Sequence, residues 1–335
     1  MKIAYIIYPE VIISNKSNGI RSQAETWAEM LRQEGVEVVL VNNWGNYNWK
    51  DYDAIHLFGG GRWVYSIVRR LSAINPNICW SPIYDPSFNS GIKEKIISLM
   101  KEYTNDSFKW SYLYQIRKEQ RVKKVLTRSL FETDYLNRQF GVPKERMALI
   151  PLSYSNFCMP YEKCEKEDFC LHISSIYQSR KNVIRLIEAA KKYNFKLVLA
   201  GNKGTDEQYR PIKEAIGANQ NIKVLGFISE EDKIELYKRA KVFALPSTSE
   251  GVGIAAVDAA FYGCEIVITN IPGPKEYYDG KCIEVNPLDI DAIGKAVKSF
   301  MNDEIVFQPQ LAEYIGNEYS GNRIIRNLIR VYKEI

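Results

Sequence analysis

The sequence predicts an α/β protein with two domains, each built around a mostly parallel β-sheet. Three observations lead to this expectation. The chain has 335 residues, which is more than one hydrophobic core usually organises. Its 46% hydrophobic and 25% charged residues are the proportions of a globular protein. Short apolar runs alternate with segments of helical spacing, first in one half of the chain and then in the other, as in parallel βαβ units.

The first half, residues 1–155, is expected to form one domain. A helix over Ser22–Gln33 separates the first two apolar runs, and Gly35 ends it. A second helix is expected to run to Leu71 after the three glycines at 59–61. The expected strands are Lys2–Tyr8, Val36–Val41, Ala54–Phe58 and Val122–Thr127.

A linker is expected at Pro151–Glu167, where no period is visible and prolines accompany a charge run. The second domain is then expected over residues 168–310, and a helical segment, 311–335, is expected to return to the first domain. The expected strands of the second domain are Phe169–Ile173, Lys196–Ala200, Ile222–Leu225, Val242–Leu245, Glu265–Ile268 and Cys282–Val285. The expected helices are Asn182–Lys191, Glu230–Ala240, Gly253–Tyr262 and Asn322–Tyr332.

Basic residues are concentrated in one part of the chain. Residues 1–155 contain 21 Lys and Arg against 15 Asp and Glu, whereas residues 156–335 contain 24 against 25. Within residues 109–128, seven basic residues accompany a single acid, with Trp110, Tyr112 and Tyr114 among them. This mixture predicts a patch that rests on an anionic membrane, and the alternative is a solvated helix face. A nucleic-acid partner is not expected.

The start of the chain does not resemble a signal peptide, and the sequence contains no apolar run of about 18 residues. The expected location is the cytoplasm, with peripheral binding to the inner face of the plasma membrane as an extension of it. The six cysteines form no CxxC pair, and His56 and His172 are the only histidines. We therefore expect neither disulfides nor a zinc site.

The segment 245–280 carries the residues best suited to chemistry. A strand is expected at its start, and Glu250, Gly251 and Gly253 follow before the next helix. Ligands of open α/β sheets bind beyond the carboxyl ends of the strands, and glycines let a diphosphate approach a helix N-terminus. Glu250 and Asp258 are expected roughly 10 Å apart, which suits the two ends of one long ligand. The alternative is a pair of solvated acids at a helix start.

This segment resembles the signature of glycosyltransferase family 4, whose retaining enzymes have the GT-B fold of two Rossmann-like domains facing across a cleft. The matching residues are Pro246, Ser247, Glu250, Gly251, Gly253, Asp258, Gly263, Gly273, Pro274 and Glu276. The resemblance implies that Glu250 is catalytic and that Asp258, with Gly251, Val252, Gly253 and Ile254, binds a nucleotide-sugar donor.

Further matches to the family lie outside this segment. In the second half they are Lys181 with Arg180 for the phosphates, Gly201 for a strand-end glycine loop, and Gly226, Phe227 and Ile228 for the base. In the first half they are Gly19 in a turn near the donor phosphates and Asp53–His56 at a strand end. Three departures are Ser175 where the family has Arg, Asp258 where it has Glu, and Tyr84 with Asp85 where it often has an acceptor-facing His.

The resemblance implies a mechanism without a protein nucleophile. Lys181 and Arg180 would stabilise the charge on the departing diphosphate, and that phosphate would take the proton of the acceptor. Asp85 and His56 are the candidates for orienting the acceptor hydroxyl. Their alternatives are a turn residue before a proline and a buried strand-end histidine.

No metal and no resident cofactor are expected, since the acid pair Asp51 and Asp53 precedes a strand instead of ending one. UDP-sugars are the expected donors and GDP-sugars the next. The expected acceptor is a glycan or a lipid-linked sugar, in cell-surface polysaccharide or glycoconjugate synthesis. Two other hypotheses remain open, namely a non-catalytic nucleotide-sugar-binding subunit of a glycosyltransferase complex and a sugar-nucleotide epimerase of the same fold.

Overall fold

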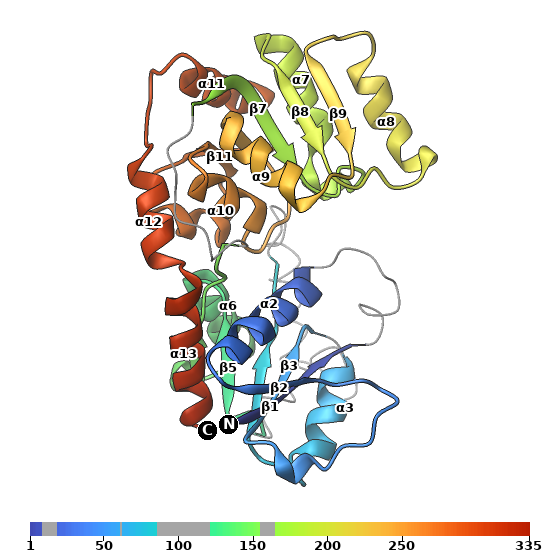
Figure 1. Ribbon diagram of the computed structural model, residues 1–335. Coiled ribbons are helices and arrows are strands. Elements are labelled where there is room, and N and C mark those ends of the chain that lie inside the picture. The colour runs from blue at the N-terminus through green and yellow to red at the C-terminus, as the bar shows by residue number, and fades with distance from the viewer. Residues whose placement is uncertain (9–18, 61, 86–120, 155–164) are drawn as a thin grey trace. The chain divides into compact units, whose positions relative to one another are not determined.

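The computed structural model describes residues 1–8, 19–60, 62–85, 121–154 and 165–335 (Figure 1). These residues divide into two compact units. The first unit contains 1–84, 121–153 and 321–335, and the second contains 165–320 together with Asp85 and Tyr154. Among the described helices, none is both long and apolar enough to cross a membrane.

A parallel sheet of six strands forms the centre of the first unit, in the order β2-β1-β3-β4-β5-β6. Its strands are β1 (Lys2–Ile7), β2 (Glu37–Leu40), β3 (Ala54–Phe58), β4 (Ile78–Ser81), β5 (Lys124–Thr127) and β6 (Met147–Leu149). Every residue of β3 and β4 is buried, as expected where helices cover both faces of a parallel sheet.

The described helices and 3-10 turns of the first unit lie around this sheet. They are α2 (Gly19–Gln33), η1 (Trp49–Asp51), α3 (Arg62–Leu71), α6 (Leu130–Phe140), η2 (Lys144–Arg146) and α13 (Gly321–Lys333). Ser129 caps α6 by accepting from the Glu132 amide, and Gly141 ends it in the left-handed conformation. The core between helices and sheet includes Leu57, Val68, Trp80 and Leu136.

The second unit also has a parallel sheet of six strands, in the order β12-β11-β10-β7-β8-β9. Its strands are β7 (Glu167–Ile173), β8 (Leu197–Ala200), β9 (Ile222–Gly226), β10 (Ala240–Leu245), β11 (Glu265–Thr269) and β12 (Ile283–Val285). Its helices and turns are η3 (Ser179–Lys181), α7 (Val183–Tyr193), α8 (Asp206–Ile216), α9 (Glu230–Arg239), α10 (Ile254–Phe261), η4 (Pro274–Tyr278), α11 (Ile290–Met301) and α12 (Gln310–Glu318).

The end of the chain is divided between the two units, which corrects the expectation of one returning segment over 311–335. Helix α12 packs against α10 of the second unit and buries Leu311, Ala312 and Ile315. Helix α13 belongs to the first unit, where it packs against α2 and buries Ile324 and Leu328. The returning segment is therefore 321–335.

Candidate functional site

In the second unit, the order of the strands reverses between β7 and β10. Strands β8 and β9 extend from one side of β7, whereas β10, β11 and β12 extend from the other. The loops that follow β7 and β10 therefore leave the sheet in opposite directions, and the carboxyl ends of such a strand pair are where open α/β sheets bind ligands. The loop after β7 contains Arg180 and Lys181, and the loop after β10 contains Glu250 and Gly251.

Hydrogen bonds fix these two loops to each other. The Thr248 amide donates to the Arg180 carbonyl at 2.8 Å, and the Arg180 guanidinium donates to the Ser249 carbonyl at 3.3 Å. Asn182, in the left-handed conformation, donates from its side-chain amide to the carbonyls of Pro246 at 2.9 Å and Pro287 at 2.5 Å. The position of one loop thus determines that of the other.

Lys181 and Glu250 meet at the centre of this pair of loops. The Lys181 Nζ lies 2.6 Å from Glu250 Oε2, which also accepts from the Ser247 hydroxyl at 3.2 Å. Their side chains are 13% and 9% exposed. A cation and a carboxylate 69 residues apart are therefore presented together at one edge of the sheet. Arg180 instead holds the loops, through Gln178 and Ser249.

Two helices begin at this edge without a side chain that caps them. Helix α7 starts after Asn182 and α10 starts after Gly253, and neither cap residue accepts from the first turn through its side chain. Unclaimed N–H groups of this kind suit a phosphate. Gly251 and Val252 are buried, and Ile254 is half-buried at the first position of α10. Asp258, one turn further along α10, is 4% exposed.

The ends of β8 and β9 complete the carboxyl edge of the second unit. Gly201 has φ +115°, and a Cβ atom there would lie 1.9 Å from the Ser174 carbonyl oxygen. Only glycine fits this approach. Phe227, after β9, is 85% exposed, and Ile228 beside it is half-buried. Gly201, Phe227 and Ile228 thus follow strands at the same carboxyl edge of the sheet as Lys181.

His172 lies beneath this edge and is a residue that the sequence analysis did not assign to the site. Its Nδ1 is 2.8 Å from the Ala244 carbonyl oxygen, and its Nε2 is 2.7 Å from the Ser174 hydroxyl. A carbonyl only accepts, so the proton is on Nδ1 and the serine donates to Nε2. The available signal was the spacing of His172 and Ser174, two residues apart at the end of β7, because residues i and i+2 of an extended chain point to the same side.

In the first unit, His56 is fully buried, which corrects its assignment as a catalytic residue. Its Nδ1 is 2.6 Å from the Tyr332 hydroxyl and its Nε2 is 2.9 Å from the Ser81 hydroxyl. The Tyr332 hydroxyl lies 2.8 Å from that of Tyr5. Because both ring nitrogens are engaged away from solvent, His56 lacks the reach that a base for a bound acceptor needs. It anchors α13 to the sheet instead.

Because both histidines are buried, we expect each folded unit to lose stability in acid. Burial lowers the pKa of His56 to about 3 and that of His172 to about 4, whereas an unfolded histidine titrates near 6.5. The unfolded chain therefore binds more protons below pH 6.5, and stability falls with pH until each folded pKa is reached. From pH 7 to pH 5 each unit should lose about 2 kcal/mol.

Urea unfolding at the two pH values measures this loss. The variants His56→Asn and His172→Asn should each reduce the acid effect by the contribution of one histidine, in the unit concerned. If the double variant loses as much stability at pH 5 as the parent chain, carboxylates and not histidines are responsible.

Two candidate residues of the notional acceptor and phosphate sites, Asp85 and Gly19, are both exposed. Asp85 is exposed and lies four residues after the last residue of β4. Ile83, just before it, has φ +55°, a region that costs a β-branched residue about 1–3 kcal/mol. Gly19 is exposed at the first position of α2, and a Cβ atom there would meet nothing within 4 Å. Its backbone therefore does not require glycine.

The basic stretch 109–128 is described only from residue 121 onward, and residues 109–120 lie outside the described part. In the described part, Arg128 is buried in an ion pair with Glu132, and the Lys124 ammonium lies 3.4 Å from Glu334. Lys123 donates to Asn77 and to the carbonyl oxygen of Ile335. The membrane hypothesis therefore loses Arg128, because a buried guanidinium does not reach a lipid surface.

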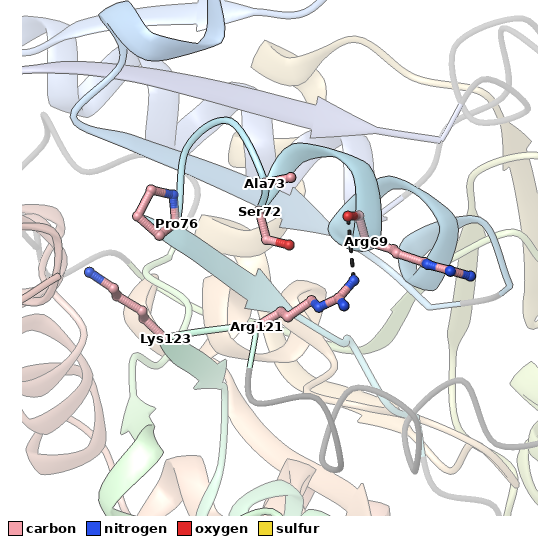
Figure 2. Close-up of a pocket in the computed structure, with 6 residues that line it drawn as sticks. All are labelled: Arg69, Ser72, Ala73, Pro76, Arg121 and Lys123. Atoms are coloured by element: carbon pink, nitrogen blue, oxygen red, sulfur yellow. Dashed lines mark hydrogen bonds between the residues drawn. The ribbon is translucent and has the colours of Figure 1, made fainter.

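Figure 2 shows a pocket of about 340 Å³ in the first unit. Its lining residues are Arg69, Ser72, Ala73, Pro76, Arg121 and Lys123. The Arg121 guanidinium donates to the Arg69 carbonyl there at 3.4 Å. These residues precede β4 and β5, so the pocket lies at the amino edge of that sheet, opposite the edge where such folds bind ligands.

The chain is similar to known glycosyltransferases in sequence and in fold. Residues 160–319 match the family model described as glycosyl transferases group 1. The crystal structure of Anabaena Alr3699/HepE in complex with UDP and glucose matches with a TM-score of 0.70 and 15% identity, over 100% of both chains. The fold is GT-B.

Two curated relatives match with less coverage. The O-antigen chain mannosyltransferase B of Escherichia coli is 25% identical over 236 residues, which are 63% of this chain and 60% of that protein. The uncharacterized glycosyltransferase MJ1607 of Methanocaldococcus jannaschii is 29% identical over 168 residues, 46% of this chain and 42% of that one. The chain thus spans less than two thirds of the length of these relatives.

Proposed function

We propose that this chain is a retaining glycosyltransferase that moves a hexose from a nucleotide sugar to a glycan or a lipid-linked acceptor. The observation that carries the proposal is the Lys181–Glu250 pair at the strand-order reversal of the second unit, 2.6 Å apart and beside two uncapped helix starts. The match of residues 160–319 to glycosyl transferases group 1 covers this site.

Each group has a role that its position supports. Lys181 and the N–H groups at the starts of α7 and α10 stabilise the negative charge that develops on the departing diphosphate. Glu250 holds Lys181 and contacts the donor sugar, while Asp258 binds the ribose. Phe227 and Ile228 contact the base, and Gly201 lets the backbone approach it.

The reaction that we propose requires no protein nucleophile. The bond from the anomeric carbon to the phosphate oxygen breaks as the acceptor oxygen bonds to the same face of that carbon, and the acceptor proton passes to the departing phosphate. Asp85 remains the candidate for orienting the acceptor hydroxyl, because it is exposed whereas His56 is buried.

The donor is proposed from the family resemblance and from the relatives. A UDP-sugar is the first candidate, and the HepE complexes with UDP and with UDP-glucose support it. A GDP-sugar is the second. Mannose is a candidate sugar, because the E. coli relative is named a mannosyltransferase of the O-antigen chain. That name also supports a role in cell-surface polysaccharide synthesis.

A nucleotide panel with and without a chelator tests the proposal. UDP or GDP at 100 times its Kd should stabilise the folded chain by about 2.7 kcal/mol, and UDP-glucose or GDP-mannose should be slowly hydrolysed. We expect the hydrolysis rate to be unchanged by EDTA, because Lys181 carries the phosphate charge. Within the described residues no cluster of three or more His, Cys, Asp or Glu side chains is placed to hold a metal ion.

Two outcomes would contradict this proposal. Hydrolysis that stops with EDTA and resumes with magnesium or manganese would show that a metal carries the phosphate charge. Binding of a nucleotide sugar with neither hydrolysis nor transfer would favour the non-catalytic subunit instead.

A further inference from the structure

The loop after β2 exposes a tryptophan side chain almost completely. Trp44 is 94% exposed, whereas Trp27 and Trp80 of the same unit are 1% and 0% exposed. The same loop also sends two rings inward, because Tyr47 and Trp49 pack against the core of the first unit. Trp44 therefore lies on the surface beside aromatic neighbours that reach the core. An exposed tryptophan is the kind of residue that contributes most of the binding energy once a partner covers it.

Hydrogen bonds fix residues 42–47 in a turn, which we call the Trp44 turn. The Trp44 amide donates to Asn42 Oδ1 at 3.0 Å, and the Gly45 amide donates to the Asn42 carbonyl at 2.9 Å. The Asn42 amide donates to the Tyr47 hydroxyl at 2.7 Å, and the Tyr47 ring packs on that of Trp49, with centroids 5.3 Å apart. The turn is thus anchored to the core through Tyr47, so a ligand that covers the indole has little backbone to order.

Uncharged polar side chains accompany the exposed ring. Residues 41–49 contain no Asp, Glu, Lys or Arg, and Asn43 and Asn46 are exposed on either side of Trp44 in the chain. Anionic membranes and nucleic acids are bound through basic residues, which this segment lacks. An amide both donates and accepts hydrogen bonds, as sugar hydroxyls do, and an indole offers a broad apolar face. The combination suits a neutral sugar, which has hydroxyls around its rim and C–H groups on its faces.

We propose that the Trp44 turn is a binding site for a neutral glycan chain, apart from the site of sugar transfer. The indole receives the C–H face of one hexopyranose ring, and Asn43 and Asn46 exchange hydrogen bonds with its hydroxyls. This inference rests on the proposed glycosyltransferase function and deepens it, because it assigns a glycan of several sugars as the acceptor.

The strand order of the first unit explains why the length of the glycan matters. Strands β1 and β3 lie between β2, which leads into the Trp44 turn, and β4. The carboxyl ends of β2 and β4 are therefore about 14 Å apart, at about 4.8 Å for each strand spacing. A chain of several sugars can extend along this edge of the sheet to the Trp44 turn, whereas a single sugar bound at the end of β4 cannot.

The variant Trp44→Ala tests the site by polysaccharide binding. We expect α-mannan or dextran to retard the parent chain in a native gel, and Trp44→Ala to raise the Kd for that polysaccharide at least tenfold. Because Trp44 is 94% exposed, its removal should leave the urea unfolding midpoint unchanged. Trp44→Phe keeps an aromatic face, and its Kd should lie between those of the parent and the alanine variant.

Fluorescence quenching reports on the same ring directly. Trp44 is exposed, whereas the other described tryptophans are buried or half-buried. Bound polysaccharide should therefore protect the parent chain from quenching by iodide. In Trp44→Ala this protection should be absent.

Two further variants test the turn and the position of the ring. A Cβ atom at Gly45 would lie 2.5 Å from the Tyr47 hydroxyl oxygen, so Gly45→Ala forces this hydroxyl away from the Asn42 amide while the indole is retained. We expect the Kd of the polysaccharide to rise at least threefold. Leu149→Ala is the matched control, because Leu149 is 41% exposed on β6, at the opposite end of the same strand order. It should have the parent Kd.

Transfer kinetics separate this site from the one where the acceptor reacts. Trp44→Ala should raise the KM for α-mannan oligosaccharides at least tenfold. The KM for octyl α-mannoside, which carries a single sugar, and the Kd of UDP should both stay within a factor of two. An equal rise in the KM of the long and the short acceptor would place Trp44 at the reacting sugar and overturn a separate site.

Each remaining outcome has a definite meaning. A parent chain that hydrolyses a nucleotide sugar but binds neither α-mannan nor dextran overturns the glycan site and leaves the glycosyltransferase function standing. A parent chain that binds these polysaccharides through Trp44 but neither hydrolyses nor transfers a nucleotide sugar overturns the proposed function and leaves the glycan site standing. Self-association that Trp44→Ala abolishes, without polysaccharide binding, would assign the ring to a second copy of this chain instead.

Discussion

Replacing Glu250 by Gln should reduce sugar transfer at limiting donor by about 100-fold or more. The Glu250 carboxylate holds the Lys181 ammonium at 2.6 Å and accepts from Ser247. Gln keeps the shape and one acceptor oxygen, but it leaves the largely buried Lys181 ammonium without a counter-charge, so folding should also lose about 3 kcal/mol. What it removes is the charge that aligns Lys181 with the departing diphosphate. Asp258→Asn should act in the same direction, mainly by weakening donor binding.

A second buried carboxylate of the same unit provides the control for this experiment. Glu265 is 6% exposed at the first residue of β11, and it accepts from the amides of Phe307 and Gln308. It lies at the amino edge of the sheet, away from Lys181. Glu265→Gln should therefore change stability but not the transfer rate. If Glu250→Gln and Asp258→Asn both retain the parent rate at limiting donor, the site is assigned wrongly.

Replacing Gly201 by Ala should destabilise the second unit by about 3 kcal/mol or more. The new Cβ atom would lie 1.9 Å from the Ser174 carbonyl oxygen and 2.9 Å from the carbon of the same carbonyl. The obstacle is backbone and not a flexible side chain, so the ends of β7 and β8 must separate. Because φ is +115° at this position, alanine also brings strain of its own. Any chain that still folds should bind nucleotide weakly.

Gly280→Ala is the matched control, since Gly280 also has a positive φ, +74°, but nothing lies within 4 Å of its virtual Cβ. It should cost about 1 kcal/mol, the conformational penalty alone. Urea unfolding of the two variants measures the difference. Equal losses would mean that the Ser174 carbonyl moves aside freely and that the close approach of β7 and β8 is not required.

The elements that the sequence predicted best are those with strong local patterns. Ala54–Phe58 coincides with β3, and Glu230–Ala240 differs from α9 by one residue. Helix α8 was missed because it buries only Ile212 and contains Pro211, so its apolar spacing is poor. Its start was nevertheless visible, since Thr205 and Gln208 form a capping box.

In the site, the local sequence was enough to predict which residues lie at the strand ends, because turns, glycine positions and helix starts depend on neighbours along the chain. Glu250 and Gly253 were predicted on this basis, whereas Lys181 and Gly201 were assigned through the family resemblance, which also implied the GT-B fold. Only the tertiary structure decided which of these residues meet. Lys181 pairs with Glu250 across 69 residues because β7 and β10 are neighbours in the sheet.

His56 shows the same difference between what the sequence and the tertiary structure reveal. The sequence placed His56 at a strand end, where a catalytic residue and a buried one look alike, since a pattern along one strand does not reveal what packs against it. The tertiary structure decided between them by bringing Tyr332, 276 residues away, to its ring. Burial and long-range partners depend on the packing of the whole unit, and this is why they became known only from the structure.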